Sequence, residues 1–109
     1  MRTIKSRQDF ERAFTQGKRF NHPLIRMVIC ESISEGDPGR VAFAAAKRLG
    51  NAVFRNRSKR VLREAARACG LPAANKEIIL FATGKTATAA PDDMAAALDA
   101  LLRRANIHA

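Results

Sequence analysis

One segment, residues 77–83, constrains the fold of this chain more than any other. It holds Ile-Ile-Leu-Phe at its centre and lacks the polar–apolar alternation of a half-buried strand. A short β-rich run of this kind is typical of a strand that is buried on both faces. We therefore expect it to lie in the middle of a sheet, and we expect helices to cover that sheet.

Turn and capping residues divide the first half of the chain. Ser6 predicts the start of a helix that Gly17 ends. Two β-rich runs, residues 23–30 and 40–46, predict strands joined by a turn-rich segment, and we expect these strands to pair as a hairpin. A further short strand is left open at residues 19–22.

The second half of the chain predicts two more helices around the central strand. Asn51 is suited to cap a helix over residues 52–69, and Pro91 opens a last helix with one apolar stripe. The order is helix, strand, strand, helix, strand, helix, which predicts a single α/β domain over residues 1–109, an α+β sandwich with a mixed sheet covered by helices. The stripe comprises Met94, Ala97, Leu98, Leu101, Leu102 and Ala105.

The charge of the chain narrows the classes of partner. There are 20 Lys+Arg against 10 Asp+Glu, giving +10 at pH 7, and 47% of residues are hydrophobic, which excludes a disordered tail. The electrostatic field of this net positive charge attracts polyanions. The predominance of Arg over Lys favours phosphate recognition. We see neither a membrane span nor a secretory signal and expect a cytoplasmic protein. Cys30 and Cys69 are expected to be buried and reduced rather than zinc ligands.

Residues 47–67 concentrate this charge, with eight basic residues and one acid, Glu64. On a helix, the apolar side chains gather on one side and the cations on the adjoining arc, with Arg57 nearer the opposite edge. Like charges four residues apart, such as Arg55 and Lys59, destabilise a helix unless a polyanion neutralises them. The segment therefore predicts a nucleic-acid-binding helix. Its apolar side comprises Phe54, Ser58, Val61, Leu62, Ala65 and Cys69.

The same segment resembles the signature of the bacterial ribonuclease P protein component. The resemblance rests on Gly50-Asn51-Ala52-Val53, Arg55-Asn56-Arg57, Lys59-Arg60 and Arg63-Glu64. It implies a left-handed βαβ crossover, against the right-handed norm. It also implies two partners, the catalytic RNA of ribonuclease P and precursor tRNA, whose 5′ leader this endoribonuclease removes. The RNA would carry the chemistry with Mg²⁺, and no obligate protein partner is expected.

The resemblance assigns two sets of site residues. Phe10 and Phe14 match positions that line a cleft for the leader between the first helix and the sheet, although plain core packing of both rings stays open. Arg19 and Phe20 are expected neighbours in that cleft. The residues expected to contact RNA are Lys47, Arg48, Asn51, Arg55, Asn56, Arg57, Lys59, Arg60 and Arg63, with Arg67 on the same arc.

Two stretches depart from the family pattern. Ala44-Ala45-Ala46 stands where the family commonly has a small polar residue, and Met27, Val28 and Ile29 stand where it often has an aromatic residue facing the cleft. No catalytic residue and no metal site is expected in this chain, and His22 and His108 are expected at the surface. The alternative function is that of a ribosomal or other structural RNA-binding protein without a processing role.

Overall fold

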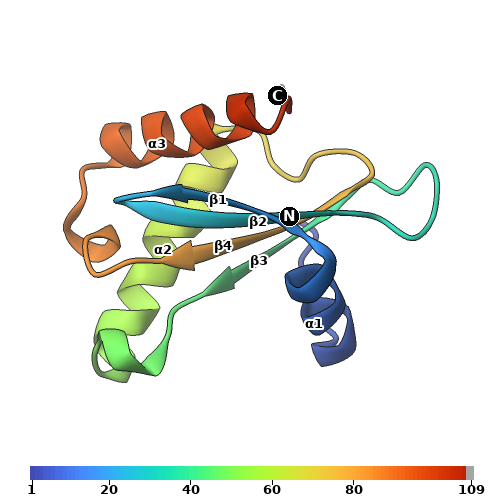
Figure 1. Ribbon diagram of the computed structural model, residues 1–109. Coiled ribbons are helices and arrows are strands. Elements are labelled where there is room, and N and C mark those ends of the chain that lie inside the picture. The colour runs from blue at the N-terminus through green and yellow to red at the C-terminus, as the bar shows by residue number, and fades with distance from the viewer. Residues whose placement is uncertain (108–109) are drawn as a thin grey trace.

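The computed structural model describes residues 1–107, so His108 lies outside the described residues. Figure 1 shows a four-stranded sheet with helices on both sides. The elements are α1 (Arg7–Gln16), β1 (Lys18–His22), β2 (Ile25–Glu31), β3 (Arg40–Ala44), the 3₁₀ turn η1 (Lys47–Leu49), α2 (Ala52–Ala68), β4 (Lys76–Ala82), the 3₁₀ turn η2 (Thr86–Thr88) and α3 (Pro91–Arg104).

The sheet is mixed and has the strand order β1-β2-β4-β3. β1 and β2 form an antiparallel hairpin, so the strand left open at residues 19–22 exists. β4 pairs antiparallel with β2 and parallel with β3. The central position predicted for residues 77–83 is confirmed, and Ile78, Ile79 and Leu80 are all 0% exposed.

The expected hairpin between residues 23–30 and 40–46 is wrong. β4 lies between β2 and β3, so these two strands are not neighbours. The physical reason is the apolar character of β4, which favours the centre of the sheet. There, helices cover both of its faces, and the strands β2 and β3 pair with its two edges. β3, α2 and β4 form the parallel crossover, which is the connection that the resemblance implies to be left-handed.

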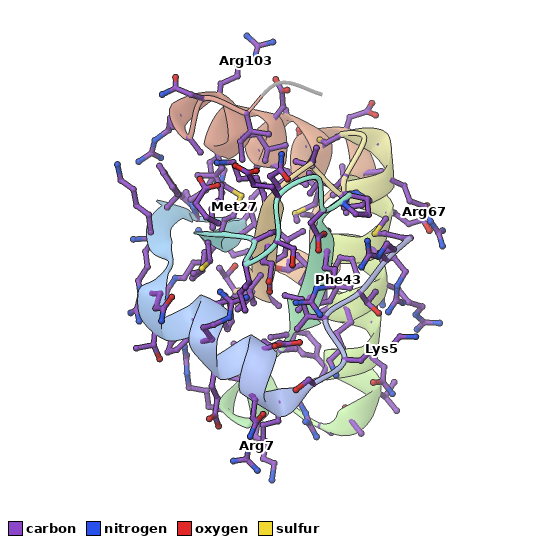
Figure 2. All side chains as sticks on the ribbon, turned by 90° about the vertical axis from the view of Figure 1, so that its right-hand side faces the viewer. Lys5, Arg7, Met27, Phe43, Arg67 and Arg103 are labelled. Carbon is purple, nitrogen blue, oxygen red and sulfur yellow. The ribbon has the colours of Figure 1, made fainter. Side chains whose placement is uncertain are left out.

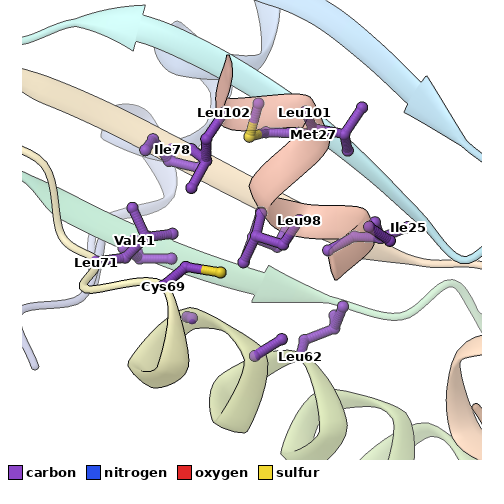
Figure 3. Packing of buried hydrophobic residues seen from close by; sticks show 14 of the residues in the cluster. Ile25, Met27, Val41, Leu62, Cys69, Leu71, Ile78, Leu98, Leu101 and Leu102 are labelled. Atoms are coloured by element: carbon purple, nitrogen blue, oxygen red, sulfur yellow. The ribbon is translucent and has the colours of Figure 1, made fainter. Parts of the chain in front are cut away.

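The two faces of the sheet carry different helices. α2 and α3 pack on the face that presents Ile25, Met27 and Ile78, and Figure 3 shows these residues beside leucines of both helices. α1 packs on the opposite face, below one end of the sheet in Figure 1. The stripe predicted for α3 is confirmed, since all its members except the half-buried Ala105 are buried.

Local signals fix the ends of α1 and α2 as predicted. The side-chain oxygen of Asn51 accepts a hydrogen bond from the Phe54 N–H at 2.9 Å, and Ser6 caps α1 in the same way at 3.4 Å. Gly17 ends α1 with φ −76°, a value open to any residue. Glycine is needed there for space, because a Cβ would lie 2.4 Å from Cγ1 of Val28. No helix in residues 1–107 is long and apolar enough to cross a membrane.

Candidate nucleic-acid interface

α2 packs against the protein along one side. Ser58 and Leu62 are 0% exposed, and Ala65 and Cys69 are buried further along. The Ser58 hydroxyl donates to the Phe54 carbonyl at 3.1 Å, so this buried polar group has a partner. The predicted apolar side is therefore confirmed, with Phe54 and Val61 half-buried at its edge.

Most cations of η1 and α2 form no salt bridge with carboxylates of residues 1–107. Within residues 1–107, Arg67 forms the only salt bridge in this set, with Glu64 at 2.7 Å, and Figure 2 shows Arg67 pointing outward from α2. The other cations are exposed or half-buried, and none has a carboxylate partner in the part of the chain that the structure describes. We call them the cationic flank, which comprises Lys47, Arg48, Arg55, Arg57, Lys59, Arg60 and Arg63.

Several polar side chains of η1 and α2 have neighbours that restrict their positions. The guanidinium of Arg63 lies over the ring of Phe43, 5.1 Å from its centroid, which orients the side chain by a cation–π contact. Arg57 and Arg60 border a second groove, between α2 and the start of α3. The side-chain oxygen of Asn51 is used by the helix cap, so its amide nitrogen is the group that is free to bind a phosphate.

A groove of about 700 Å³ opens on the sheet face that α1 covers in part. Phe14, Val28 and Phe81 give it apolar walls, and Phe14 keeps 38% of its surface exposed. Arg19, Arg26 and Arg48 bring three cations to the same groove. Apolar rings between guanidinium groups are the arrangement that binds single-stranded nucleic acid, since bases stack on rings and cations follow the phosphates.

Phe81 of β4 is the centre of the aromatic contacts. Its ring makes edge-to-face contacts with Phe14, at a centroid distance of 5.8 Å, and with Phe10, at 6.3 Å. The guanidinium of Arg19 lies 4.5 Å from the centroid of Phe14. Arg19, Phe14 and Phe81 therefore form a continuous set of contacts from β1 across α1 to the middle of the sheet.

The structure separates the four residues expected in the cleft. Phe14 and Arg19 line the groove, whereas Phe10 is half-buried against the core below α1 and does not line it. The assignment of Phe20 to the cleft is wrong. Its side chain is 8% exposed and belongs to the core on the opposite face of the sheet. Because side chains alternate along a strand, Phe20 must point away from the side that Arg19 and Asn21 share.

The sequence pattern did not indicate two groove residues, Phe81 and Arg26. They stand directly opposite each other in the β2–β4 register. The aromatic ring missing from β2 is thus supplied by the neighbouring strand, while Val28 fills the β2 position in the groove. Side chains alternate along a strand, so Phe81 lies on the face opposite to Leu80, but the apolar sequence of β4 does not mark that face as the open one.

The side chains of the groove and the cationic flank can bind a nucleic acid and hold it in place. Among the residues described, no group of three or more His, Cys, Asp or Glu side chains is arranged to hold a metal ion. His22 lines the groove, and its Nδ1 accepts a hydrogen bond from the Leu24 N–H at 3.1 Å, which occupies one ring nitrogen.

Comparison with known proteins identifies relatives along the whole chain. The ribonuclease P protein component of Symbiobacterium thermophilum is 45% identical over 65 residues, which cover 59% of this chain and 55% of that protein. That of Dehalococcoides mccartyi is 33% identical over 104 residues, covering 95% and 84%. The structure of the Staphylococcus aureus RNase P protein superposes with a TM-score of 0.82 at 26% identity, covering 100% of this chain and 99% of that one.

A second solved structure shows the same fold at lower identity. The RNase P protein from Thermotoga maritima superposes with a TM-score of 0.78 at 22% identity, covering 95% of this chain and 97% of that one. The family model described as Ribonuclease P matches residues 1–106, and the chain belongs to this family.

Proposed function

We propose that this chain is the protein subunit of a bacterial ribonuclease P and that it binds the catalytic RNA and the 5′ leader of precursor tRNA. One observation carries the proposal: the cationic flank and the groove are adjacent and share Arg48. A substrate strand lying in the groove thus runs toward the surface that holds the RNA. Family membership supports the assignment to this endoribonuclease.

The cationic flank is the surface for the catalytic RNA. Its seven side chains are free of this chain's own carboxylates within residues 1–107, so phosphates can take the place of counterions along the helix. Arginine provides most of these side chains, and each guanidinium can hold a phosphate with two parallel hydrogen bonds. Binding RNA would also relieve the repulsion between Arg55, Lys59 and Arg63, which follow one another at four-residue intervals.

The groove is the surface for the leader. Phe14 and Phe81 offer rings to unpaired bases, and each stacked base contributes about 1–3 kcal/mol. Arg19, Arg26 and Arg48 are placed to follow the phosphates between those bases. Stacking tolerates any base, so we expect the leader to be held with little sequence preference.

The chemistry of phosphodiester hydrolysis is proposed to lie in the RNA partner together with Mg²⁺. Mg²⁺ prefers carboxylate oxygens among protein ligands. The residues that line the groove include no carboxylate, and Glu64, the one acid among residues 47–67, is engaged by Arg67. The residues of this chain therefore do not fit a magnesium site at the interface. Their contribution is to bind, to neutralise phosphates and to orient the substrate.

The alternative, a ribosomal or other structural RNA-binding protein, explains the cationic flank equally well. It does not explain the groove, in which an exposed phenylalanine is combined with three cations on a separate face. Membership of the Ribonuclease P family also favours the first function.

Reconstitution tests the proposal. The purified chain is combined with a bacterial ribonuclease P RNA and precursor tRNA, beside reactions with the chain alone and with the RNA alone. We expect the complex to remove the leader at a Mg²⁺ concentration at which the RNA alone is slow, and we expect tighter binding of precursor than of mature tRNA. Processing by the chain alone would move the chemistry into the protein. Native co-purification with ribosomal RNA instead of ribonuclease P RNA would favour the alternative.

A further inference from the structure

A partly buried ionic cluster, centred on a buried carboxylate, joins α1 to the sheet on the groove side. Glu77 of β4 is 2% exposed, and its Oε1 accepts hydrogen bonds from Arg12 of α1 and from Arg40 of β3, the latter at 2.9 Å. Arg40 also donates to Asp9 of α1 at 3.0 Å. We call these four residues the Glu77 cluster, and it ties the first half of α1 to two strands.

The charges of the Glu77 cluster balance each other. Two guanidinium groups face two carboxylates, and the hydrogen bond to Glu77 raises the pKa of Arg40, against the opposing effect of burial and with a smaller contribution from Asp9. The second carboxylate oxygen of Glu77, Oε2, accepts no hydrogen bond from the described residues. Arg12 and Arg40 therefore share Oε1, and removal of the Glu77 charge weakens both of these contacts at once, while Arg40 keeps its hydrogen bond to Asp9.

The cluster is placed to control the groove through α1. α1 has only ten residues, and Phe14 follows Arg12 by two positions on it. Beyond Phe14, Gly17 packs tightly against Val28 of β2. α1 is thus fixed at two points, the Glu77 cluster and Gly17, and Phe14 lies between them. Any tilt of α1 after loss of the cluster must move Phe14 relative to Phe81, the ring that it contacts across the groove.

We propose that Glu77 is a positioning residue for the 5′ leader, because it holds α1 in the position relative to the sheet that places Phe14 at the groove. Glu77 does not line the groove, so it would act on the leader through Phe14. The inference rests on the proposed function, since it assigns Glu77 a part in leader binding and not in binding of the catalytic RNA. The cationic flank stands on α2 and η1, which have no member of the Glu77 cluster.

Glu77→Gln tests the proposal, since it keeps the shape of the side chain and removes its charge. Glu31→Gln is the matched control. Glu31 pairs with Lys76, the residue beside Glu77 on β4, but its side chain is 73% exposed and it takes no part in the Glu77 cluster. Both variants therefore remove one carboxylate from an ion pair at the same end of the sheet, and only Glu77→Gln weakens a link between α1 and the sheet.

The measurement is leader-dependent affinity in the reconstituted complex. Each variant is assembled with the catalytic RNA, and dissociation constants are compared for precursor tRNA with a leader that crosses the groove and with a leader too short to reach it. We expect Glu77→Gln to reduce the preference for the long leader about tenfold, the contribution of one stacked base. Glu31→Gln should retain the preference, and the affinity for the catalytic RNA should be unchanged in both. Hydrogen exchange should be faster in the amides of α1 and unchanged in those of α2.

Four results separate the possible failures. Full retention of the long-leader preference by Glu77→Gln would overturn the positioning role, as would unchanged exchange in α1. If Glu77→Gln unfolds the domain, Arg12→Gln replaces it, because this change removes the hydrogen bond from α1 to Glu77 and leaves Glu77 paired with Arg40. A full preference in that variant also overturns the inference. Absence of any leader preference in the unmodified protein would refute the proposed function itself.

Discussion

The double variant Arg55→Ala with Arg57→Ala should weaken binding of the catalytic RNA in a way that salt dependence can quantify. Each phosphate neutralised by a cation lowers the slope of log affinity against log salt by about 0.9. The cationic flank has seven members, of which Arg63 is partly engaged by Phe43. With about six phosphates engaged the slope is about −5, and loss of two contacts should change it to about −3.5.

The assay is a titration of labelled ribonuclease P RNA with protein at several concentrations of monovalent salt and constant Mg²⁺. Arg55 and Arg57 stand in the first turns of α2, where Arg55 is half-buried and Arg57 exposed. Neither forms a salt bridge within residues 1–107, so their removal should leave the thermal melt almost unchanged.

The control variant is Arg7→Gln with Arg103→Gln, which removes the same formal charge elsewhere. Both residues are paired with carboxylates of their own helices, Arg7 with Glu11 and Arg103 with Asp99. The slope of this control should match that of the unmodified protein. An unchanged slope in the Arg55/Arg57 variant, or an equal change in the control, would show that net charge rather than the cationic flank determines RNA affinity.

Three further predictions follow from the packing. Phe14→Ala should reduce the preference for precursor over mature tRNA with little loss of stability, because Phe14 is partly exposed in the groove. Phe10→Ala should instead lower the melting temperature, because Phe10 packs in the core below α1. Equal melting temperatures of the two variants would contradict these separate roles. Gly17→Ala should destabilise the fold by about 1–3 kcal/mol in a urea titration, since a methyl group there overlaps Val28. Burial, followed by the negative charge of nearby Asp99, raises the pKa of the Cys69 thiol, so alkylation at pH 8 should be slow until the protein unfolds.

Local signals predicted the elements because they act over a few residues. Asn51 caps α2 through a hydrogen bond to a residue three positions later, and the apolar period of α2 found its buried side. The separation of cations from apolar residues on this helix was also visible in the sequence. It is a property of helix geometry alone and needs no knowledge of the sheet.

Strand pairing could not be predicted in the same way. The neighbours of β3 and β2 are decided by β4, which is more than thirty residues away from the start of β3. Phe20 was assigned to the wrong face and Phe81 was missed, for the related reason that their positions depend on which face of the sheet is covered. A buried run such as Ile78–Phe81 contains no alternation that would mark one face as open, and only the partial cover by α1 makes Phe81 a groove residue.

The position of β4 also sets the order of events during synthesis. Of the four strands in this sheet, β4 is translated last, yet it supplies the middle of the sheet, and its pairs reach back to Ile25 and Arg40. A nascent chain that has reached only α2 lacks β4 and α3, so of the strand pairs in the sheet it can form only the β1–β2 hairpin, and the apolar side of α2 lacks much of its packing surface. Completion of the domain waits for translation of residues 76–104, and in that interval the exposed helix is open to chaperones and to any nearby RNA.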